Sequence, residues 1–386
     1  MKVPNREGMV NGMHDGKKIL GIIFSNMHDE VLRELTERRT MASVPFGGRY
    51  RFIDFTLSSF VNSNIQSVGV ITKSNYQSLM DHLGSGREWD LARKREGLFI
   101  LPPFGNAGSG IYRGRIEALS GIMGFIKHSN ARYVVLADCD MIYNIDIKEV
   151  LNSHIERQAE ITVAYQKKTV TPENSRESTV FVCDKNARVQ DVMLSPTIEG
   201  EHCVSINLMV LEKSLLERLV SENMSRNLYS MEKDVLQARA SQLRIYGYEY
   251  TGFCAKVDSM RDYYDANMLM LKKEVRDELF LPARPVYTKV RDDMPVKYGL
   301  CSSVKNSLIA DGCVIEGEVE NSVLFRGVTV GKGAKVQNSI VMQDTIIGDQ
   351  SMLNYCITDK DVTIKDNRTL MGYLSYPVFI SKGSVV

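Results

Sequence analysis

The turn after the first apolar stretch of the chain is the first place where residue types point to chemistry. A strand is predicted over 19–24, and the turn that follows at 25–30 reads SNMHDE, without a glycine. In nucleotide-binding α/β proteins this turn is usually glycine-rich, because backbone N–H groups must approach a phosphate closely. Bulky side chains and two acids, Asp29 and Glu30, would instead repel a triphosphate. The sequence therefore predicts a nucleotide-binding type of fold whose phosphate loop has lost the features that bind phosphate.

Acidic residues follow a second apolar strand, which is predicted over 133–137. Asp138 and Asp140 come directly after that strand, and Asp146 lies nearby. Ligands of parallel α/β sheets bind outside the carboxyl ends of the strands, so this acidic loop and the turn at 25–30 should meet. Carboxylates in that position could hold Mg²⁺ together with substrate phosphates. The alternative interpretation is a solvated acidic loop that binds no metal.

Two regions with different patterns of apolar residues must position these side chains. Up to about residue 275, apolar strand patterns at 67–72, 133–137 and 161–165 alternate with helical patterns. Between the first two strands, apolar residues recur at helical spacing and predict one buried helix face, formed by Ile116, Leu119, Met123 and Ile126. Continuous apolar strands that alternate with helices predict an α/β domain with a mostly parallel sheet, covered on both faces.

The C-terminal region has a short repeat. Pro282, Pro285 and Pro295 mark a linker, and after Cys301 an aliphatic residue recurs near every sixth position, followed by small or turn residues. This period is typical of a hexapeptide β-helix, whereas a β-meander, the alternative, would alternate strictly and turn about every 8–12 residues. The flat sides and open edge of a β-helix favour an oligomer. The predicted parts are a disordered tail (1–16), an α/β domain (17–275), a linker (276–300) and a β-helix domain (301–386).

Composition argues against several classes of partner. The 386 residues carry a formal net charge of +1, which offers no large positive field for nucleic acid or an anionic membrane. No apolar run approaches the roughly 20 residues of a membrane helix, and the polar first 18 residues lack the apolar core of a secretory signal. Seven scattered cysteines without a CxxC pair indicate free thiols in a reducing compartment, and the six histidines show no metal-ligand spacing. The expected localisation is cytoplasmic.

Three motifs carry a family resemblance. The first is the run PFGGRYRFIDF at 45–55, the second is HLGSG at 82–86 with Trp89, and the third is LPP at 101–103 followed by YRG at 112–114. Together with the order of the domains, they make the chain similar to bacterial glucose-1-phosphate adenylyltransferases (ADP-glucose pyrophosphorylases) over most of its length. The resemblance implies a Rossmann-like, GT-A-like nucleotidyltransferase domain followed by a left-handed hexapeptide β-helix.

The residues that the resemblance assigns to catalysis are mostly absent. In that family a sugar phosphate attacks the α-phosphorus of ATP and releases pyrophosphate, so catalysis consists of positioning, Mg²⁺ and positive charge on the phosphates. Asp140 matches the family aspartate that holds Mg²⁺. The loop arginine, the lysine of Lys-Pro-Ala, the adenine-pocket glutamine, the sugar-phosphate lysine of Glu-Lys-Pro and the second metal carboxylate correspond to Val31, Met41, Lys73, Ser195 and Lys256.

These departures make the chain resemble the GlgD type of subunit, a non-catalytic relative found beside the catalytic enzyme in glycogen synthesis of Gram-positive bacteria. The resemblance implies a regulatory subunit without a cofactor that works with a catalytic partner in a hetero-oligomer, with a heterotetramer as the expected form. Arg49 and Arg51 fall in the region where the family binds regulatory phosphates, and Arg113 and Arg115 could bind an anion at a helix start. The alternative for all four arginines is solvation or pairing with acids.

Two other functions stay open at the level of the sequence. One is an active nucleotidyltransferase with a rearranged phosphate loop, in which Asp140 would hold Mg²⁺ and Arg113, Arg115 or Lys256 would replace the lost cations. The other is a sensor whose residual pocket binds a sugar-phosphate effector instead of substrates.

Overall fold

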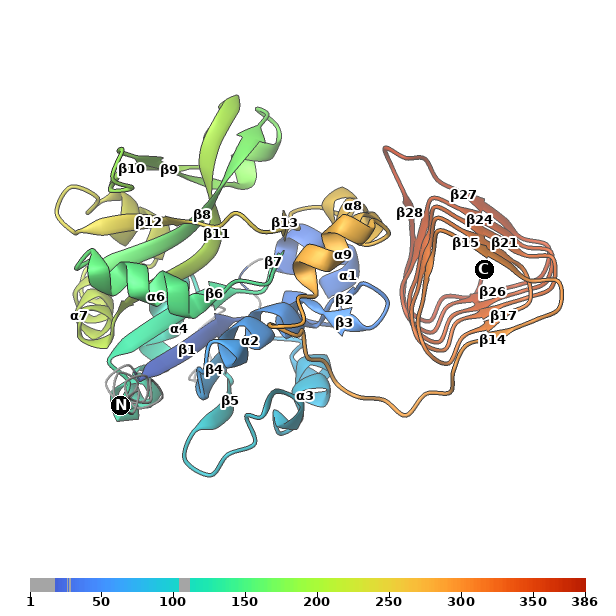
Figure 1. The fold of residues 1–386 in the computed structure, drawn as a ribbon, viewed down its shortest axis with the longest axis horizontal. Helices are drawn as coiled ribbons and strands as arrows, with labels where there is room; N and C mark the ends of the chain where they lie inside the picture. The colour runs from blue at the N-terminus through green and yellow to red at the C-terminus, as the bar shows by residue number, and fades with distance from the viewer. Residues whose placement is uncertain (1–17, 26, 28, 104–111) are drawn as a thin grey trace, which may run out of the picture.

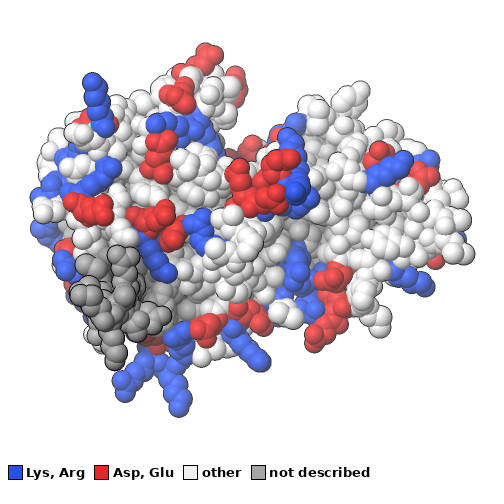
Figure 2. Space-filling view, in the orientation of Figure 1, with Lys and Arg blue, Asp and Glu red and all other residues white. Residues whose placement is uncertain are grey.

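The computed structural model describes residues 18–25, 27, 29–103 and 112–386. The tail expected at 1–16 lies outside the described residues, as do Asn26 and His28 of the first turn. Figure 1 shows an α/β unit and a coil of stacked strands, joined by one extended connection. On the face seen in Figure 2, basic and acidic side chains are intermingled and form no broad field of one sign. No helix in the described ranges is long and apolar enough to cross a membrane.

The α/β unit is built on a nine-stranded sheet of order β10-β9-β11-β6-β1-β4-β5, in which β8 pairs with β11 and β12 pairs with β8. Strands β6, β1, β4 and β5 are parallel, whereas β11 runs antiparallel to β6, β8 and β9. The predicted mostly parallel sheet is confirmed, with β11 as its long reversed strand. The strands are β1 (Ile19–Phe24), β4 (Ser67–Ile71), β5 (Gly97–Leu101), β6 (Tyr133–Asp138), β8 (Ile161–Val170), β9 (Thr179–Cys183), β10 (Val189–Leu194), β11 (Gly200–Glu212) and β12 (Ile245–Glu249).

Helices cover both faces of this sheet because each one buries an apolar side. Ile116, Leu119 and Ile126 of α4 and α5 belong to the core on one face, and Leu57 of α2 and Val150 of α6 belong to the core on the other. The buried helix face predicted between residues 116 and 126 is thus confirmed. The helices are α1 (Arg33–Thr36), α2 (Phe52–Asn62), α3 (Gln77–Leu83), α4 (Arg115–Gly121), α5 (Met123–His128), α6 (Ile147–Glu156), α7 (Lys213–Met224), α8 (Met260–Leu269) and α9 (Lys273–Leu279).

Short elements complete the α/β unit. Two short antiparallel pairs, β2 with β3 and β7 with β13, lie outside the large sheet. They are β2 (Pro45–Phe46), β3 (Tyr50–Arg51), β7 (Met141–Tyr143) and β13 (Cys254–Lys256). The 3₁₀ turns are η2 (Asp29–Leu32), η3 (Met41–Ser43), η4 (Arg87–Trp89) and η5 (Asn174–Glu177), and η6 (Glu232–Gln237) is a π-helix.

The motifs at 45–55 and 82–89 meet in the structure. The Asp54 carboxylate accepts a hydrogen bond from the Arg51 backbone N–H (2.9 Å) at the start of α2 and contacts His82 Nε2 at 2.6 Å. The His82 ring packs edge-on against Trp89, which is 1% exposed. Burial lowers the pKa of His82, so the imidazole is neutral at pH 7. Trp89 is therefore a core residue.

The C-terminal unit is a left-handed parallel β-helix of five coils. Its three sides are the five-stranded sheets β14-β17-β20-β23-β26, β15-β18-β21-β24-β27 and β16-β19-β22-β25-β28. Val319, Val336 and Leu353 stack in register through the interior, each at most 1% exposed, which confirms the predicted hexapeptide architecture. The strands are β14 (Lys297–Tyr298), β15 (Ser303–Lys305), β16 (Leu308–Ile309), β17 (Val314–Ile315), β18 (Glu318–Glu320), β19 (Val323–Leu324), β20 (Thr329–Val330), β21 (Lys335–Gln337), β22 (Ile340–Val341), β23 (Ile346–Ile347), β24 (Met352–Asn354), β25 (Cys356–Thr358), β26 (Thr363–Ile364), β27 (Thr369–Met371) and β28 (Val378–Ile380).

Asparagines form one corner of the β-helix. Asn306, Asn321 and Asn338 have φ values of 41°, 47° and 46°, a left-handed conformation that asparagine tolerates better than most residues. The Asn306 amide donates to Asn321 Oδ1 (2.7 Å), and the Asn338 amide donates to Asn354 Oδ1 (3.0 Å). The turn residues between the aliphatic positions therefore bend the chain and also join successive coils.

The two units share a buried interface. Leu32, Met41 and Phe55 of the α/β unit pack in one core cluster with Phe325 and Met342 of the β-helix. Beside this cluster, one guanidinium nitrogen of Arg39 lies 2.8 Å from both carboxylate oxygens of Asp359, with each side chain only 4% exposed. Because removing either partner of such a pair would leave an uncompensated buried charge, the pair fixes how the units meet.

Adjacent isoleucines on β23 test the interior of the β-helix. Ile347 is 1% exposed and Ile346 is 50% exposed. We expect Ile347→Ala to lower the free energy of unfolding by about 2–5 kcal/mol, because it leaves a cavity between stacked coils. The matched change Ile346→Ala should cost less than about 1 kcal/mol. Urea denaturation of both variants measures this difference, and equal losses would contradict the assigned strand faces.

Candidate functional site

A cavity of about 260 Å³ lies at the carboxyl end of β6, where ligands bind in sheets of this kind. Arg113, Arg115 and Lys256 line it together with Met27, which comes from the turn after β1. Other residues in its wall are polar or acidic, namely Thr179, Ser205, Asn207, Ser230 and Glu232. The structure thus gathers three residues that the sequence analysis singled out around one polar cavity, and Asn207 of its wall binds a fourth, Asp140.

Asp140 is held by backbone and amide contacts. Its backbone carbonyl accepts a hydrogen bond from the Val257 N–H (3.1 Å), because β13 runs antiparallel to β7 with Lys256 opposite Met141. Its Oδ2 accepts a hydrogen bond from the Asn207 amide at 2.8 Å, where β11 has an irregular register. The side chain is 1% exposed, so this carboxylate is a buried, oriented group beside the cavity.

Lys256 brings positive charge to the same place. Its Nζ lies 2.6 Å from Asp258 Oδ2, and both side chains are 17% exposed. Lys256 lines the cavity and is paired in β13 with Met141, the residue after Asp140. At the position where the family resemblance implies a second metal carboxylate, the structure therefore places an ammonium group with its own carboxylate partner.

Arg115 is enclosed by acids. Its guanidinium forms ion pairs with Asp138, at the end of β6, and with Glu232, at the start of η6. The Arg115 side chain is 8% exposed and Asp138 is 1% exposed. A buried arginine between two carboxylates is compensated by the protein itself, so its charge is directed at Asp138 and Glu232.

Arg113 lies at the mouth of the cavity and is also paired. Its guanidinium lies 2.8 Å from Glu117 Oε1, and its backbone N–H donates to Glu117 Oε2 at 2.7 Å. The guanidinium carbon is 3.7 Å from the centre of the Tyr229 ring, a cation–π contact. The Glu117 contact raises the pKa of Arg113, which therefore stays charged.

In the turn after β1, an acidic side chain binds a backbone N–H group of the segment that follows it. The Asp29 carboxylate accepts a hydrogen bond from the Met41 backbone N–H at 2.8 Å. Val31 lies in η2 and is half-buried, while the Met41 side chain is 1% exposed and belongs to the interface core with the β-helix. The segment that would grip phosphates in the family is here a packing element whose N–H group is bound by a protein carboxylate.

Lys73 faces the same turn from the end of β4. Burial lowers the pKa of Lys73, and the nearby charges of Asp29 and Glu30 partly offset this effect. The two acids of the turn thus lie where they can compensate the lysine. The acidic residues of the turn therefore balance the charge of Lys73. These three side chains together offer no excess of positive charge to a triphosphate.

The remaining predicted positions lie elsewhere. Ser195 follows β10, is exposed, has a φ of 49°, and donates its backbone N–H to the Ser178 carbonyl. Arg49 is exposed and acts electrostatically on Arg326 of the β-helix. Arg51 lies at the interface between the units and donates to the carbonyl and hydroxyl oxygens of Ser78.

The donors at the cavity do not fit Mg²⁺. This ion requires near-octahedral oxygen ligands and is usually bound by one or two carboxylates with substrate phosphates. Asp140 is accompanied by Lys256, and Asp138 is already paired with Arg115. Among the described residues, no group of three or more His, Cys, Asp or Glu side chains could hold a metal ion.

Sequence reasoning missed two residues that shape the site and two that extend the interface. Asn207 and Glu232 hold Asp140 and Arg115, but no local motif announces either of them. Arg39 and Lys360 lie near Arg51, from opposite units of the structure. The one available signal was Glu117, which lies four residues after Arg113, a spacing that predicts a helix-type ion pair.

Comparisons with known proteins agree with this geometry. A nucleotidyl transferase family profile matches residues 21–273, and a profile of the GlmU-like C-terminal hexapeptide matches residues 294–373. The chain is 36% identical to the glycogen biosynthesis protein GlgD of Bacillus subtilis, covering 95% of this chain and 97% of the relative. It is 41% identical to GlgD of Geobacillus stearothermophilus over 83% of both chains.

Relatives named as enzymes are also similar. The glucose-1-phosphate adenylyltransferase of Pseudothermotoga lettingae is 32% identical, with 83% of this chain and 76% of the relative covered. The chain belongs to the nucleotidyl transferase family and, within it, to the group that contains the glucose-1-phosphate adenylyltransferases and the GlgD proteins.

The two arginines at the cavity make a matched pair for a stability test. We expect Arg115→Met to lower the free energy of unfolding by about 3–5 kcal/mol, because Asp138 and Glu232 lose their buried cation. Arg113→Met removes an exposed, solvent-screened pair and should cost far less than Arg115→Met. Urea denaturation at pH 7 measures both values. A loss for Arg113→Met as large as that for Arg115→Met would refute the assigned roles.

Proposed function

We propose that the chain is a catalytically degenerate, regulatory subunit of glucose-1-phosphate adenylyltransferase in glycogen biosynthesis, working with a catalytic partner in the cytoplasm. The partner would convert ATP and glucose 1-phosphate to ADP-glucose and pyrophosphate. The names of the relatives support the pathway. The observation that carries the degenerate role is the charge arrangement in the cavity, where Lys256 accompanies Asp140 and Arg115 is bound by Asp138 and Glu232.

The size of the catalytic loss supports the same role. Removing one preorganised donor from a developing charge typically costs about 10²–10³ in rate. Here the loop arginine and two lysines have no counterpart at Val31, Met41 and Ser195, and Met41 is buried in the interface core. Such effects are not additive, but several of them together leave little turnover. Mg²⁺ would be needed only if the chain were active, and the donors beside Asp140 argue against that.

The retained carboxylate favours a second candidate, an active enzyme with a rearranged loop. This function would require Arg113, Arg115 or Lys256 to stabilise the phosphates of ATP. All three are already paired with carboxylates, namely those of Glu117, Asp138, Glu232 and Asp258. Substrate phosphates would have to displace these pairs, so we rank this function second.

The surface of the β-helix supports an assembly with a partner. Four large apolar side chains around the turn between β27 and β28 are exposed: Met371, Tyr373, Leu374 and Tyr376, with exposures between 53% and 78%. Exposed apolar clusters of this kind mark interaction surfaces. A hetero-oligomer, with a heterotetramer as the expected form, would cover them.

A cluster of cations between the units is the effector site that we propose for this subunit. Arg39 and Arg51 come from the α/β unit and Lys360 from the β-helix. Asp359 pairs directly with Arg39 and partly offsets the effect of burial on Lys360. Burial lowers the pKa of Arg51 to about 10; Asp54 opposes this shift, and the charge of Arg39 adds to it. Burial with the charges of Arg51 and Arg39 lowers the pKa of Lys360 to about 7. An anionic effector such as a sugar phosphate would relieve this repulsion and bridge the two units.

Pyrophosphate release from ATP and glucose 1-phosphate with Mg²⁺ tests the degenerate role. We expect no turnover by the chain alone, and a rise in the activity of a catalytic relative when the two are co-purified. Asp140→Asn should leave that rise unchanged, because the carboxylate performs no chemistry in this chain. Turnover by the isolated chain that Asp140→Asn abolishes would establish the second candidate instead.

The pKa of Lys360 allows a test of the effector site. Sulfate, whose charge is constant near neutral pH, should favour protonated Lys360, so its affinity is highest at or below pH 7. As the pH rises from 7 to 8.5 the unliganded lysine loses its proton, and the dissociation constant should rise roughly tenfold. Calorimetry in two buffers of different ionisation enthalpy would show proton uptake. Lys360→Ala should remove the pH dependence, while exposed Lys365→Ala should keep it. Identical pH profiles for the native chain and Lys360→Ala would refute the site.

A further inference from the structure

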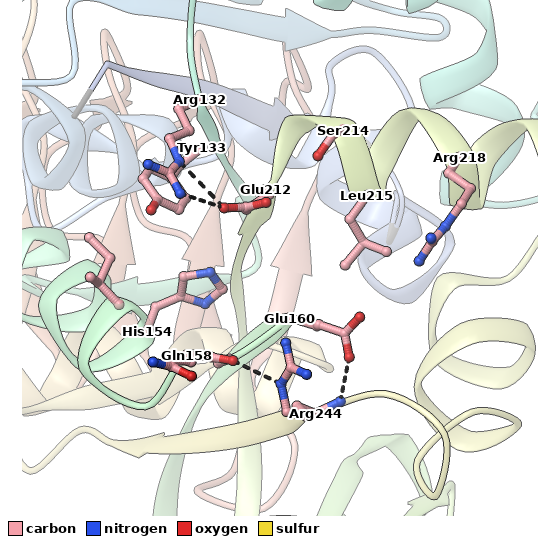
Figure 3. Close-up of a pocket in the computed structure, with 12 residues that line it drawn as sticks. Arg132, Tyr133, His154, Gln158, Glu160, Glu212, Ser214, Leu215, Arg218 and Arg244 are labelled. Carbon is pink, nitrogen blue, oxygen red and sulfur yellow. Dashed lines mark hydrogen bonds and ion pairs between the residues drawn. The ribbon is translucent and has the colours of Figure 1, made fainter. Parts of the chain in front are cut away.

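A second cavity, of about 560 Å³, lies at the opposite edge of the sheet from the candidate site (Figure 3). It is formed where β6 begins at Tyr133 and β11 ends at Glu212, two residues that are paired in the sheet. The first cavity lies at the other end of β6, about 17 Å away along the strand. Neither the proposed catalytic loss nor the proposed effector site uses this second cavity.

The start of α7 offers N–H groups to this cavity. Ser214 and Leu215, in the first turn of this 12-residue helix, both line the cavity. First-turn N–H groups have no partner inside a helix and need one from a cap, water or a ligand. Glu212 occupies the N-cap position but does not cap the helix, because its carboxylate is bound by Arg132 at 3.1 Å. The positive end of α7 therefore opens onto the cavity.

Two exposed arginines add positive charge. Arg218 lies one turn after Ser214 on α7, and its nearest acid, Glu222, is 3.9 Å away and is bound more closely by Arg239. Arg244 precedes β12, and its Nε donates to the Gln158 carbonyl (2.9 Å), which orients the guanidinium toward the cavity. Amide groups together with arginines suit a phosphate group, which takes several charge-assisted hydrogen bonds at once.

Hydrogen-bond acceptors lie beside Arg244 and the start of α7. Figure 3 shows Glu160 and Glu212 facing the open space between α7 and Arg244. Glu160 uses one oxygen to accept the Arg244 backbone N–H, and Glu212 is held by Arg132. Carboxylates that are fixed in this way accept hydrogen bonds from hydroxyl groups. The cavity thus presents phosphate-binding groups and hydroxyl-binding carboxylates side by side.

A buried histidine is aimed into the same space. His154 lines the cavity and is 2% exposed, with its Nδ1 bonded to Thr162 Oγ1 at 2.8 Å. Within the described residues its Nε2 makes no hydrogen bond. Burial lowers the pKa of His154 to about 4, so a neutral imidazole faces the cavity at pH 7. A buried polar nitrogen without a partner calls for a ligand or a water molecule.

We propose that this cavity binds a phosphate monoester of a small hydroxylated molecule. The phosphate lies between Arg218, Arg244 and the first turn of α7, and the hydroxyl groups lie against Glu160, Glu212 and His154. The site is independent of the proposed subunit function, since none of its residues belongs to the first cavity or to the interface between the units.

Calorimetry on the full chain with glycerol 3-phosphate, inorganic phosphate and glycerol tests the site. We expect glycerol 3-phosphate to bind more tightly than phosphate, and glycerol to give no heat. Arg218→Gln with Arg244→Gln should raise the dissociation constant at least about tenfold, since charge-assisted bonds are lost. Exposed Arg226→Gln, beyond the end of α7, is the matched control and should change it less than about twofold.

A second variant tests the hydroxyl side. Glu160→Gln should reduce the preference for glycerol 3-phosphate over phosphate, because one strong acceptor is lost. All variants replace exposed or half-buried residues, and thermal unfolding would verify that each is folded. The proposal would be overturned if the double variant bound glycerol 3-phosphate with the same dissociation constant as the native chain. It would also be overturned if 10 mM glycerol 3-phosphate gave no heat with the native chain. The effector variant Lys360→Ala should bind as the native chain does, which separates this site from the interface cluster.

Discussion

The buried ion pair between Arg39 and Asp359 is the constraint on which the arrangement of the two units depends. The partners are 320 residues apart in the chain, and each is almost fully enclosed. Around them, Leu32 and Met41 pack with Phe325 of the β-helix. Because the segment after β1 is part of this interface, it is fixed by packing against the β-helix. A segment held in this way cannot also be a mobile glycine loop that closes over a nucleotide.

Protein carboxylates take the places at which substrate anions would be expected. Asp29 accepts the N–H group of Met41, and Asp138 and Glu232 enclose Arg115. Charges that are matched internally need no ligand, which explains how a cavity with three cations can be stable when nothing is bound. The interface cluster differs at Lys360, on which the charges of Arg51, Arg39 and Lys382 act against that of Asp359 alone. The effector site that we propose therefore lies away from the carboxyl ends of the strands.

The β-helix was predictable because its sequence pattern is local and repeats. Each coil needs an aliphatic side chain at the same interior position, as Val319, Val336 and Leu353 show. The mostly parallel sheet followed from apolar strands alternating with helices, but the reversal of β11 has no local signature. The pairing of Asp140 with Asn207 depends on that reversal, so no spacing rule could predict it. The same holds for Glu232, which reaches Arg115 from a π-helix more than 100 residues later. Long-range pairing of this kind is set by tertiary packing, which a single sequence does not display.

The burial of Met41 has a consequence for the history of the chain. A lysine at this position, as the family resemblance implies for active relatives, would now place a charged group inside an apolar core between two domains. Such a group would be costly unless it found a partner, and the nearest segment offers an acid already bound to a backbone N–H. The packing around Met41 therefore penalises a lysine at this position. A chain with this interface would have to pass through a less stable protein to gain such a lysine, so the loss of the charge is easier to acquire than to reverse.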